Sequence, residues 1–460
     1  MIPLQQVALA FGEDSVGHLE NLTYLGVTQD SRQVQSGFVY VAIPGARVDG
    51  HDFLSAAFDA GAVCAIVERI SPINKPQILV KDAITFLQEW ARATRAQWQD
   101  KTVIGLTGSL GKTTHKEMLL QLCSNIAPCY ATPGNYNNYL GLSLSILNAP
   151  ETARIIILEL GISEPGEMAL LANIAQPDIA YVTNIHPCHL EGLGNVETIA
   201  KEKSEIYRAL TEDGLAIINN MDDHAATFYA ASTHCQQLAL CNARNSLDHQ
   251  SITLDEAGCP TFQFQLNGED YQISLPCAGA HMASNAFAAA AIASHIGVPG
   301  ATIVSTLSTY TGSAGRMQIR RCQQTNATII DDCYNANPIA MQAAIHCLSS
   351  MRHQHKILVC GDMAELGDST AYWHSQVGVW ASERGIQKMF AYGECAQQML
   401  STFTGDGAAY TNMHHLVRAV RSELSDDVAI LVKGSRASQL DHCVSALINP
   451  NVELSEELPI

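Results

Sequence analysis

The feature that most constrains this chain is a short stretch, VIGLTGSLGKTT, which runs from Val103 to Thr114. Its first residues predict a buried strand, its glycines a tight turn, and Lys112 the start of a helix. Such a turn points successive backbone N–H groups and a helix N-terminus at one position, and that arrangement binds phosphate. Lys112 would then lie along the outer phosphates of a nucleotide, and the Thr113 hydroxyl would be placed to bind Mg²⁺.

This stretch departs from the standard P-loop in one respect. The usual glycine six residues before the lysine is replaced by Leu106, so the chain carries the shorter form TGxxGKT. A strand-to-helix turn that binds nothing is the alternative interpretation. We favour an ATP site because the strand, the glycines, the lysine and the hydroxyl pair all occur in order.

Length and charge limit the classes of protein to which the chain can belong. Its 460 residues predict roughly three domains. The formal charge of −19 argues against a nucleic-acid surface, because phosphate contacts need clustered Lys and Arg. An anionic substrate must therefore be held by local groups, such as helix N-termini and single Arg residues.

The 14 cysteines include no CxxC pair, and their scattered positions predict reduced thiols in a cytosolic protein. The N-terminal residues lack the basic region and long apolar core of a signal peptide. The longest run of small apolar residues, from Ala286 to Ala293, is too short to span a bilayer. We therefore expect a soluble cytosolic protein without membrane insertion.

Residues 1–98 form a first unit of short strands and helices. Within it, Asp30, Ser31 and Arg32 lie on a polar turn before an alternating strand. These side chains could bind an anionic ligand, or Asp30 and Ser31 could simply cap the turn. Local chemistry leaves both interpretations open.

Residues 99–312 alternate strand and helix, which is typical of a parallel sheet covered on both faces. Ligands gather at the carboxyl ends of such strands. Glu159 ends a fully apolar strand, where a carboxylate is costly unless it is paired or binds metal, and we interpret it as a Mg²⁺ ligand. His189 follows the next strand, although taken alone it could be an ordinary polar loop residue.

Two other segments of this unit stay ambiguous from local pattern. The loop ATPGNYNNYLG, from Ala131 to Gly141, is rich in hydrogen-bonding groups and could contact substrate or only form a turn. Lys201 and Lys203 have acidic neighbours on a predicted helix, which ordinarily indicates a solvated charged face.

Residues 313–460 begin after a Gly- and Ser-containing linker and again alternate strand and helix. The unit predicts a Rossmann-like domain, but it has no GxGxxG, so a dinucleotide is not implied. Asp332 and Asn335 fall at the carboxyl end of one strand, and Lys433 and Arg436 at the end of another. We expect this domain to close over a bound ligand.

Motifs in all three units agree with one known family: TGSLGKTT, GNYNNYLG, ELGISEPGE, HLEGLGN, KEKSEI, DDCYNANP, GDMAELG and LVKGSR. In this order they resemble the motifs of the Mur ligases, the ATP-dependent amino-acid ligases of peptidoglycan precursor synthesis. The resemblance covers essentially the whole chain. It implies an α/β fold of three domains: a small N-terminal domain for the UDP precursor (1–98), a central P-loop ATPase domain with a parallel sheet (99–312) and a C-terminal Rossmann-like ligase domain (313–460).

The resemblance also implies a role for each candidate residue. ATP would be bound by Gly108, Ser109, Leu110, Gly111, Lys112, Thr113, Thr114, His281, Asn285, Arg316 and Asp332. The other substrates would be contacted by Ser31, Asn135, Asn137, Asn138, Asn335, Asn337, Lys433 and Arg436. Two Mg²⁺ ions would be bound by Thr113, Glu159, His189 and a carbamylated Lys203, and the catalytic residues would be Lys112, Lys203 and His189.

The carbamate is assigned by spacing within the family, whose modified lysine lies four residues before an aromatic residue. Lys203 has Tyr207 at that spacing, whereas Lys201 does not fit. Carbamylation needs a neutral amine, so Lys203 would have to be shielded from bulk water.

The YNANP, GDMAELG and KGSR motifs most resemble those of family members that join D-Ala-D-Ala to UDP-MurNAc-tripeptide. The implied enzyme is a monomeric ligase of the bacterial cytoplasm that activates a carboxylate as an acyl phosphate. His186, Met282 and Ala340 depart from the family pattern and bring the details of the adenine and dipeptide contacts into question. The rival interpretations are a Mur ligase that adds a single amino acid, a folylpolyglutamate-synthase-like enzyme and a P-loop switch NTPase.

Overall fold

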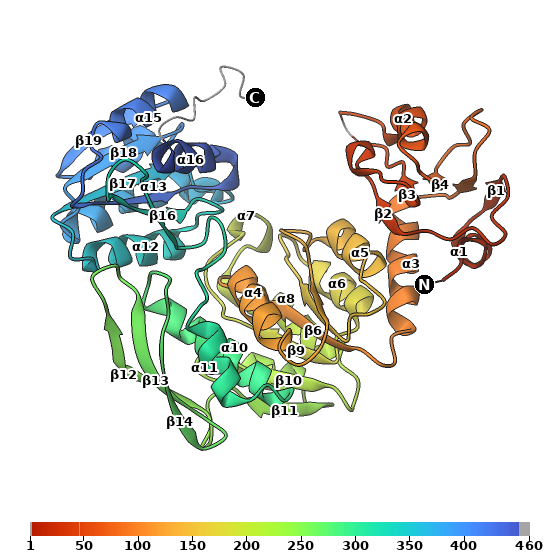
Figure 1. Cartoon of the computed structure of the whole chain (residues 1–460), viewed down its shortest axis with the longest axis horizontal. Coiled ribbons are helices and arrows are strands. Elements are labelled where there is room, and N and C mark those ends of the chain that lie inside the picture. Colours follow the sequence, from red (N-terminus) through yellow and green to blue (C-terminus); the bar gives the residue numbers. More distant parts are fainter. Residues whose placement is uncertain (1, 46, 450–460) are drawn as a thin grey trace.

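The computed structural model describes residues 2–45 and 47–449 and contains three α/β units in chain order (Figure 1). The N-terminal and C-terminal units lie on opposite sides of the central unit, which carries the P-loop (Figure 1). The predicted fold class, three α/β domains with a P-loop sheet in the middle, is confirmed.

The N-terminal unit is built on a five-stranded sheet in the order β1-β5-β4-β3-β2. Its strands are β1 (Asp14–Val16), β2 (Gly26–Thr28), β3 (Phe38–Val41), β4 (Cys64–Val67) and β5 (Gln77–Leu79), and its helices are α1 (Leu4–Phe11), α2 (Leu54–Asp59) and α3 (Ala83–Ala96). Neighbouring strands are parallel except for the β1–β5 pair. The middle strands are short apolar runs, as expected for strands buried on both faces.

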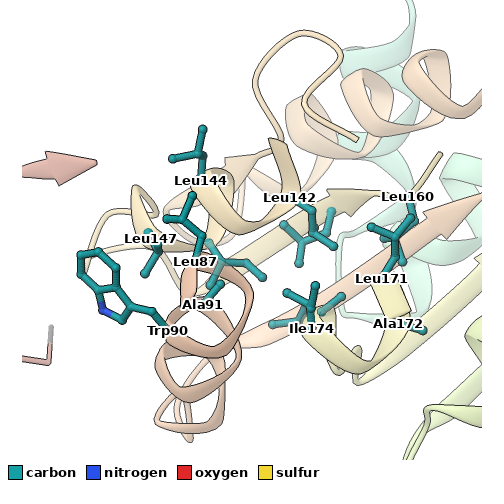
Figure 2. Close-up of a cluster of buried hydrophobic side chains, with 14 of the residues drawn as sticks. Leu87, Trp90, Ala91, Leu142, Leu144, Leu147, Leu160, Leu171, Ala172 and Ile174 are labelled. Atoms are coloured by element: carbon teal, nitrogen blue, oxygen red, sulfur yellow. The ribbon is translucent and has the colours of Figure 1, made fainter. Parts of the chain in front are cut away.

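Helix α3 joins this unit to the central one. It starts where the Asp82 side chain accepts a hydrogen bond from Thr85 N, an N-cap. Its apolar face carries Leu87 and Trp90, which lie beside Leu144 and Leu147 of α5 (Tyr139–Leu147) in one hydrophobic core (Figure 2). Because that core crosses the boundary between the units, the N-terminal unit is packed onto α5 of the central unit and is not merely tethered to it.

The central sheet has six strands, all parallel, in the order β11-β10-β9-β6-β8-β7. They are β6 (Thr102–Thr107), β7 (Cys129–Ala131), β8 (Ile155–Glu159), β9 (Ile179–Val182), β10 (Leu215–Ile218) and β11 (Gln236–Ala239). Besides α5, its helices are α4 (Lys112–Cys123), α6 (Glu167–Ala175), α7 (Leu190–Leu193), α8 (Val196–Arg208), α9 (Ala225–Ala231), α10 (His281–His295) and α11 (Gly300–Leu307). The carboxyl ends of β6, β8 and β9 therefore meet at one edge, where the P-loop begins.

Residues 246–274 form a separate antiparallel sheet. Its strands are β12 (Ser246–Leu254), β13 (Pro260–Leu266) and β14 (Glu269–Ser274). Alternate residues of β13, Phe262 and Phe264, are buried in the same core as α10. The sheet thus covers α10 from the side away from the parallel sheet.

The C-terminal unit has a six-stranded sheet in the order β15-β16-β20-β17-β18-β19, parallel except for the β15–β16 pair. Its strands are β15 (Gln318–Arg321), β16 (Thr328–Asp332), β17 (His355–Gly361), β18 (Lys388–Tyr392), β19 (Asp406–Tyr410) and β20 (Val428–Lys433). Its helices are α12 (Pro338–Ser350), α13 (Thr370–Glu383), α14 (Ala396–Leu400), α15 (Met413–Arg421) and α16 (Asp441–Ile448). Strands β16 and β20 are adjacent, so the polar clusters after them are neighbours.

All 14 cysteines of the chain are free thiols. Within the described parts of the chain, no helix combines the length and the apolar character that crossing a membrane requires.

Candidate active site

The P-loop turn depends on two glycines with positive φ. Gly108 has φ of 147° and Gly111 has φ of 76°. A Cβ atom on Gly108 would lie 1.9 Å from Thr183 Oγ1, so no side chain can be accommodated there without movement of β9's end. Helix α4 starts directly after Gly111, which directs its free N–H groups into the turn.

Two residues after β9 hold the turn in place. Asn184 Oδ1 accepts a hydrogen bond of 2.9 Å from Leu110 N, and Thr183 Oγ1 donates one of 2.6 Å to Leu110 O. Asn184 was not among the predicted site residues. Its position just past a buried strand was the available signal.

The Lys112 side chain folds over this turn, and its Nζ donates a hydrogen bond of 2.7 Å to Gly108 O. Burial lowers the pKa of Lys112, while the nearby Glu159 opposes that shift. The ammonium group is therefore already positioned above the loop that would bind phosphate.

Glu159 is the acidic centre of the site. It is only 2% exposed at the end of β8. Its Oε2 accepts a hydrogen bond of 2.9 Å from Thr113 Oγ1, and its Oε1 accepts one of 2.9 Å from Asn137 Nδ2. The expected costly burial of this carboxylate is thus offset by two donors, one of them from the Asn-rich loop.

A third compensating group, Lys116, was missed by sequence reasoning. It is fully buried one turn along α4 from Lys112, and its Nζ lies 3.9 Å from Glu159 Oε2. The same Nζ donates hydrogen bonds to Thr132 O (2.8 Å) and Gly134 O (3.0 Å). The available signal was its spacing of four from the P-loop lysine, which puts both on one face of α4. Lys116 therefore joins Glu159 to the loop that carries Asn137.

The two candidate lysines of α8 have opposite environments. Lys201 is exposed, whereas Lys203 is fully buried, so the solvated-face interpretation holds for Lys201 alone. Lys203 Nζ has no hydrogen-bond partner within the described residues. Burial, and then repulsion by Lys112, lowers the pKa of Lys203 to about 7. A large fraction of this amine is thus neutral near neutral pH, as carbamylation requires.

The linker after residue 312 brings an arginine over the P-loop. Arg316 Nη2 donates a hydrogen bond of 3.3 Å to Thr113 Oγ1, and its guanidinium lies 4.2 Å from the ring centroid of Tyr334. Stacking on an aromatic ring fixes the plane of a guanidinium. Tyr334, which belongs to the YNANP motif, was not among the predicted site residues.

Asp332 lies at the end of β16 and uses both carboxylate oxygens within the protein. Oδ1 accepts a hydrogen bond of 3.1 Å from Met317 N, and Oδ2 accepts one of 2.6 Å from Lys433 Nζ. Lys433 Nζ also donates to Asn335 O at 3.0 Å. This pair ties the linker to the two strand ends of the C-terminal sheet.

The two predicted site histidines, His189 and His281, belong to the central unit and face the C-terminal unit. His281 begins α10, and burial lowers its pKa although the charge of Asp332 acts in the opposite direction. His189 lies just before α7, and its Nδ1 contacts Glu365 Oε2 of the C-terminal unit.

A cavity of about 770 Å³ lies between the central and C-terminal units. The predicted site residues on its wall are Ser109, Leu110, Gly111, Lys112, Thr113, Thr114, Asn135, Asn137, Asn138, Glu159, His189, His281, Asn285, Arg316, Asp332, Asn335, Asn337, Lys433 and Arg436. The family departures His186, Met282 and Ala340 lie on the same wall.

Three predicted site residues lie elsewhere. Gly108 is behind the loop and presents its carbonyl to Lys112, and Lys203 is buried beneath the cavity. Ser31 lies in the N-terminal unit, where it begins a short 3₁₀ helix whose N-cap is Asp30. Asp30 also accepts hydrogen bonds from Arg32, so the capped-turn interpretation describes the contacts within this turn.

The donor set of the cavity fits a magnesium nucleotide. Mg²⁺ prefers oxygen ligands, and the Thr113 hydroxyl and the Glu159 carboxylate lie together at the start of α4. The unpartnered amine of Lys203 provides a buried position at which a carbamate would add two further oxygens. The residues present therefore fit the metal as well as the nucleotide.

Family models match three successive parts of the chain. The model of the Mur ligase family, catalytic domain, matches residues 23–95, that of the Mur ligase middle domain residues 106–293, and that of the Mur ligase, glutamate ligase domain, residues 315–436. The chain belongs to the Mur ligase family, and the resemblance seen in its motifs is confirmed.

Comparison with individual proteins shows which Mur ligases this chain resembles. The chain is 34% identical over 433 residues to the UDP-N-acetylmuramoyl-tripeptide–D-alanyl-D-alanine ligase of Bacillus subtilis, a match that covers 92% of this chain and 93% of that protein. MurF from Acinetobacter baumannii has a similar structure, with a TM-score of 0.86, 31% identity and coverage of 97% and 98% of the two chains. The MurF ligase of Thermotoga maritima, solved in complex with ADP, has a TM-score of 0.79 at 27% identity and covers 93% and 98%.

Proposed function

We propose that this chain is an ATP-dependent ligase that joins D-Ala-D-Ala to the terminal carboxylate of UDP-MurNAc-tripeptide, which gives the pentapeptide precursor of peptidoglycan. The observation that carries the proposal is the cluster around Thr113, where Glu159 of the central unit and Arg316 of the C-terminal unit both bond to one hydroxyl above the P-loop. The relatives of B. subtilis and A. baumannii support the choice of substrates.

The first step forms an acyl phosphate. A carboxylate oxygen of the tripeptide attacks the γ-phosphorus of ATP, the bond to the bridging oxygen breaks, and ADP leaves. Phosphoryl transfer needs mainly positioning and charge neutralisation. Lys112, which bonds to the P-loop turn, and Arg316, which bonds to the Thr113 hydroxyl, would supply two fixed positive charges for the phosphates.

The second step forms the amide. The free amine of D-Ala-D-Ala attacks the acyl carbon, phosphate leaves from the tetrahedral intermediate, and the amine loses its proton. An acyl phosphate hydrolyses easily, so water must be excluded while it exists. Asn335, Asn337 and Arg436 of the C-terminal unit line the cavity on the side from which the dipeptide would enter.

We assign two Mg²⁺ ions to the oxygen-rich floor of the cavity. Thr113 would bind one, and Glu159, His189 and carbamylated Lys203 would bind the other. When bound, these ions neutralise the repulsion between the attacking carboxylate and the triphosphate. Lys116 would keep Glu159 in place, since it bonds to the loop behind that carboxylate.

The N-terminal unit would hold the UDP end of the precursor, with Ser31 and its neighbours as contacts. We expect the enzyme to act as a monomer in the bacterial cytoplasm, where ATP is available and free thiols persist.

The test is phosphate release from ATP and Mg²⁺ with UDP-MurNAc-tripeptide, with and without D-Ala-D-Ala. We expect release to depend strongly on the dipeptide and to yield a UDP-linked pentapeptide. Release that needs a single amino acid instead would point to another Mur ligase activity. Release that ignores every amine would point to a switch NTPase.

A further inference from the structure

One contact between the central and C-terminal units is not explained by the roles assigned so far. Glu365 belongs to the GDMAELG segment, in the loop between β17 and α13, and its Oε2 meets His189 Nδ1 across the cavity. Both residues line the cavity, and the side chains are 24% exposed for His189 and 51% exposed for Glu365. The Glu365 carboxylate therefore contacts His189, which is a metal ligand in the proposed function.

The backbone on both sides of this contact is unusual. His189 has φ of 49° and Glu365 has φ of 61°, values that non-glycine residues rarely adopt. Such conformations are strained and persist only where the surroundings enforce them. Two strained residues from different units thus meet at a single contact.

The contact with Glu365 can decide which ring nitrogen of His189 is free to bind a metal. A neutral imidazole has one N–H donor and one lone pair, and the group bonded to one nitrogen decides which nitrogen can bind a metal. A neutral His189 that carries its proton on Nδ1, the nitrogen that contacts Glu365, would have its lone pair on Nε2. The same contact fixes the plane of the ring, which would otherwise turn freely in a partly exposed loop.

The other charged groups around Glu365 support this arrangement. Glu365 lines the cavity together with Lys112, and the opposite charges of these two side chains attract each other. A carboxylate bonded to one ring nitrogen of a metal-bound histidine holds the other nitrogen toward the metal.

We propose that Glu365 is a positioning residue that orients His189 as a metal ligand, and that it does so only when the C-terminal unit is docked on the central unit. This inference rests on the proposed function, which makes His189 a ligand. Its consequence is reciprocal: docking strengthens Mg²⁺ binding, and Mg²⁺ binding favours docking by the same factor.

The experiment compares wild type with Glu365→Ala and Glu365→Gln, and uses Glu191→Gln as the matched control. Glu191 is an exposed carboxylate on α7, two residues from His189. Bound Mn²⁺ is counted by EPR in the presence of ADP, and Mg²⁺ competes it off. Glu365→Ala should weaken the binding of one metal ion about tenfold or more, the usual effect of removing a partner of a metal-bound histidine. Glu365→Gln, which keeps an oxygen acceptor, should recover part of that loss, and Glu191→Gln should match wild type.

Docking is followed on the same proteins by small-angle X-ray scattering as Mg²⁺ is added with ADP. In Glu365→Ala the compaction should require about tenfold more Mg²⁺ than in wild type. Unchanged metal affinity in Glu365→Ala would overturn the inference, even if compaction were lost, because Glu365 would then be only a contact between units. Wild type that binds ADP without any metal dependence would instead overturn the proposed function.

Discussion

The buried amine of Lys203 makes a sharp prediction about stability. Lys203→Met replaces an ammonium group that has no hydrogen-bond partner within the described residues by an apolar side chain of similar length. Lys201→Met is the matched control, because Lys201 lies on the same helix but is exposed. We expect the Lys203 variant to be more stable than wild type at neutral pH.

The magnitude follows from the pKa. Burial lowers the pKa of Lys203 from 10.5 to about 7, so between these values the unfolded chain binds a proton that the folded chain does not. Stability from this group is therefore lowest below pH 7 and rises as pH increases toward 10.5. About 3.5 pH units at 1.36 kcal/mol per unit give a penalty of about 5 kcal/mol at low pH, of which about 3 kcal/mol is recovered between about pH 6 and about pH 9.

The assay is urea unfolding of the three proteins across that pH range in buffers free of CO₂. The free energy of unfolding of wild type should rise with pH relative to Lys203→Met, while Lys201→Met should follow wild type. Added bicarbonate should then stabilise wild type but not Lys203→Met, because carbamylation replaces a cation that Lys112 repels by an anion that Lys112 attracts. Parallel pH curves for wild type and Lys203→Met would refute the reasoning.

Three further substitutions test other contacts. Lys112→Ala should abolish ligation with little change in melting temperature, since its Nζ bonds to the P-loop turn beside the cavity and not to the hydrophobic core; loss of the fold would contradict this role. Lys116→Met should cost about 3–5 kcal/mol in urea unfolding, because it removes the fully buried ammonium group beside Glu159 and the hydrogen bonds to Thr132 O and Gly134 O; a change below about 1 kcal/mol would show that these contacts are dispensable. Gly108→Ala should remove ATP binding in calorimetry, because its Cβ would strike Thr183, whereas Gly297→Ala, which also has positive φ but meets open space, should bind normally.

Much of the site was predictable because local sequence dictates it. The TGxxGKT turn requires glycines where φ is positive, and an acidic residue at the end of an apolar strand needs partners wherever the strand lies. The order of strands and helices likewise follows from apolar periodicity, which predicted the parallel sheets of the central and C-terminal units. Motifs spread over the chain identified the family and, with it, most of the residues on the cavity wall.

What the sequence could not predict depends on atoms far apart in the chain. The pattern around Lys203 is that of a solvated helix face, and only the packing of α8 against β9 and β10 buries that amine. Lys116 looked like any helix lysine until Thr132 and Glu159 were placed beside it. Glu365 and His189 lie in different units, so no local spacing relates them.

Backbone preferences and apolar periodicity act within a few residues, so the helices and strands, the phosphate-binding turn and the family motifs can be recognised from the order of residues alone. The tertiary structure alone decided which charges are buried and which side chains meet across the cavity. Burial and electrostatic pairing depend on distance in space, and the strand order 11-10-9-6-8-7 brings together residues that the chain separates.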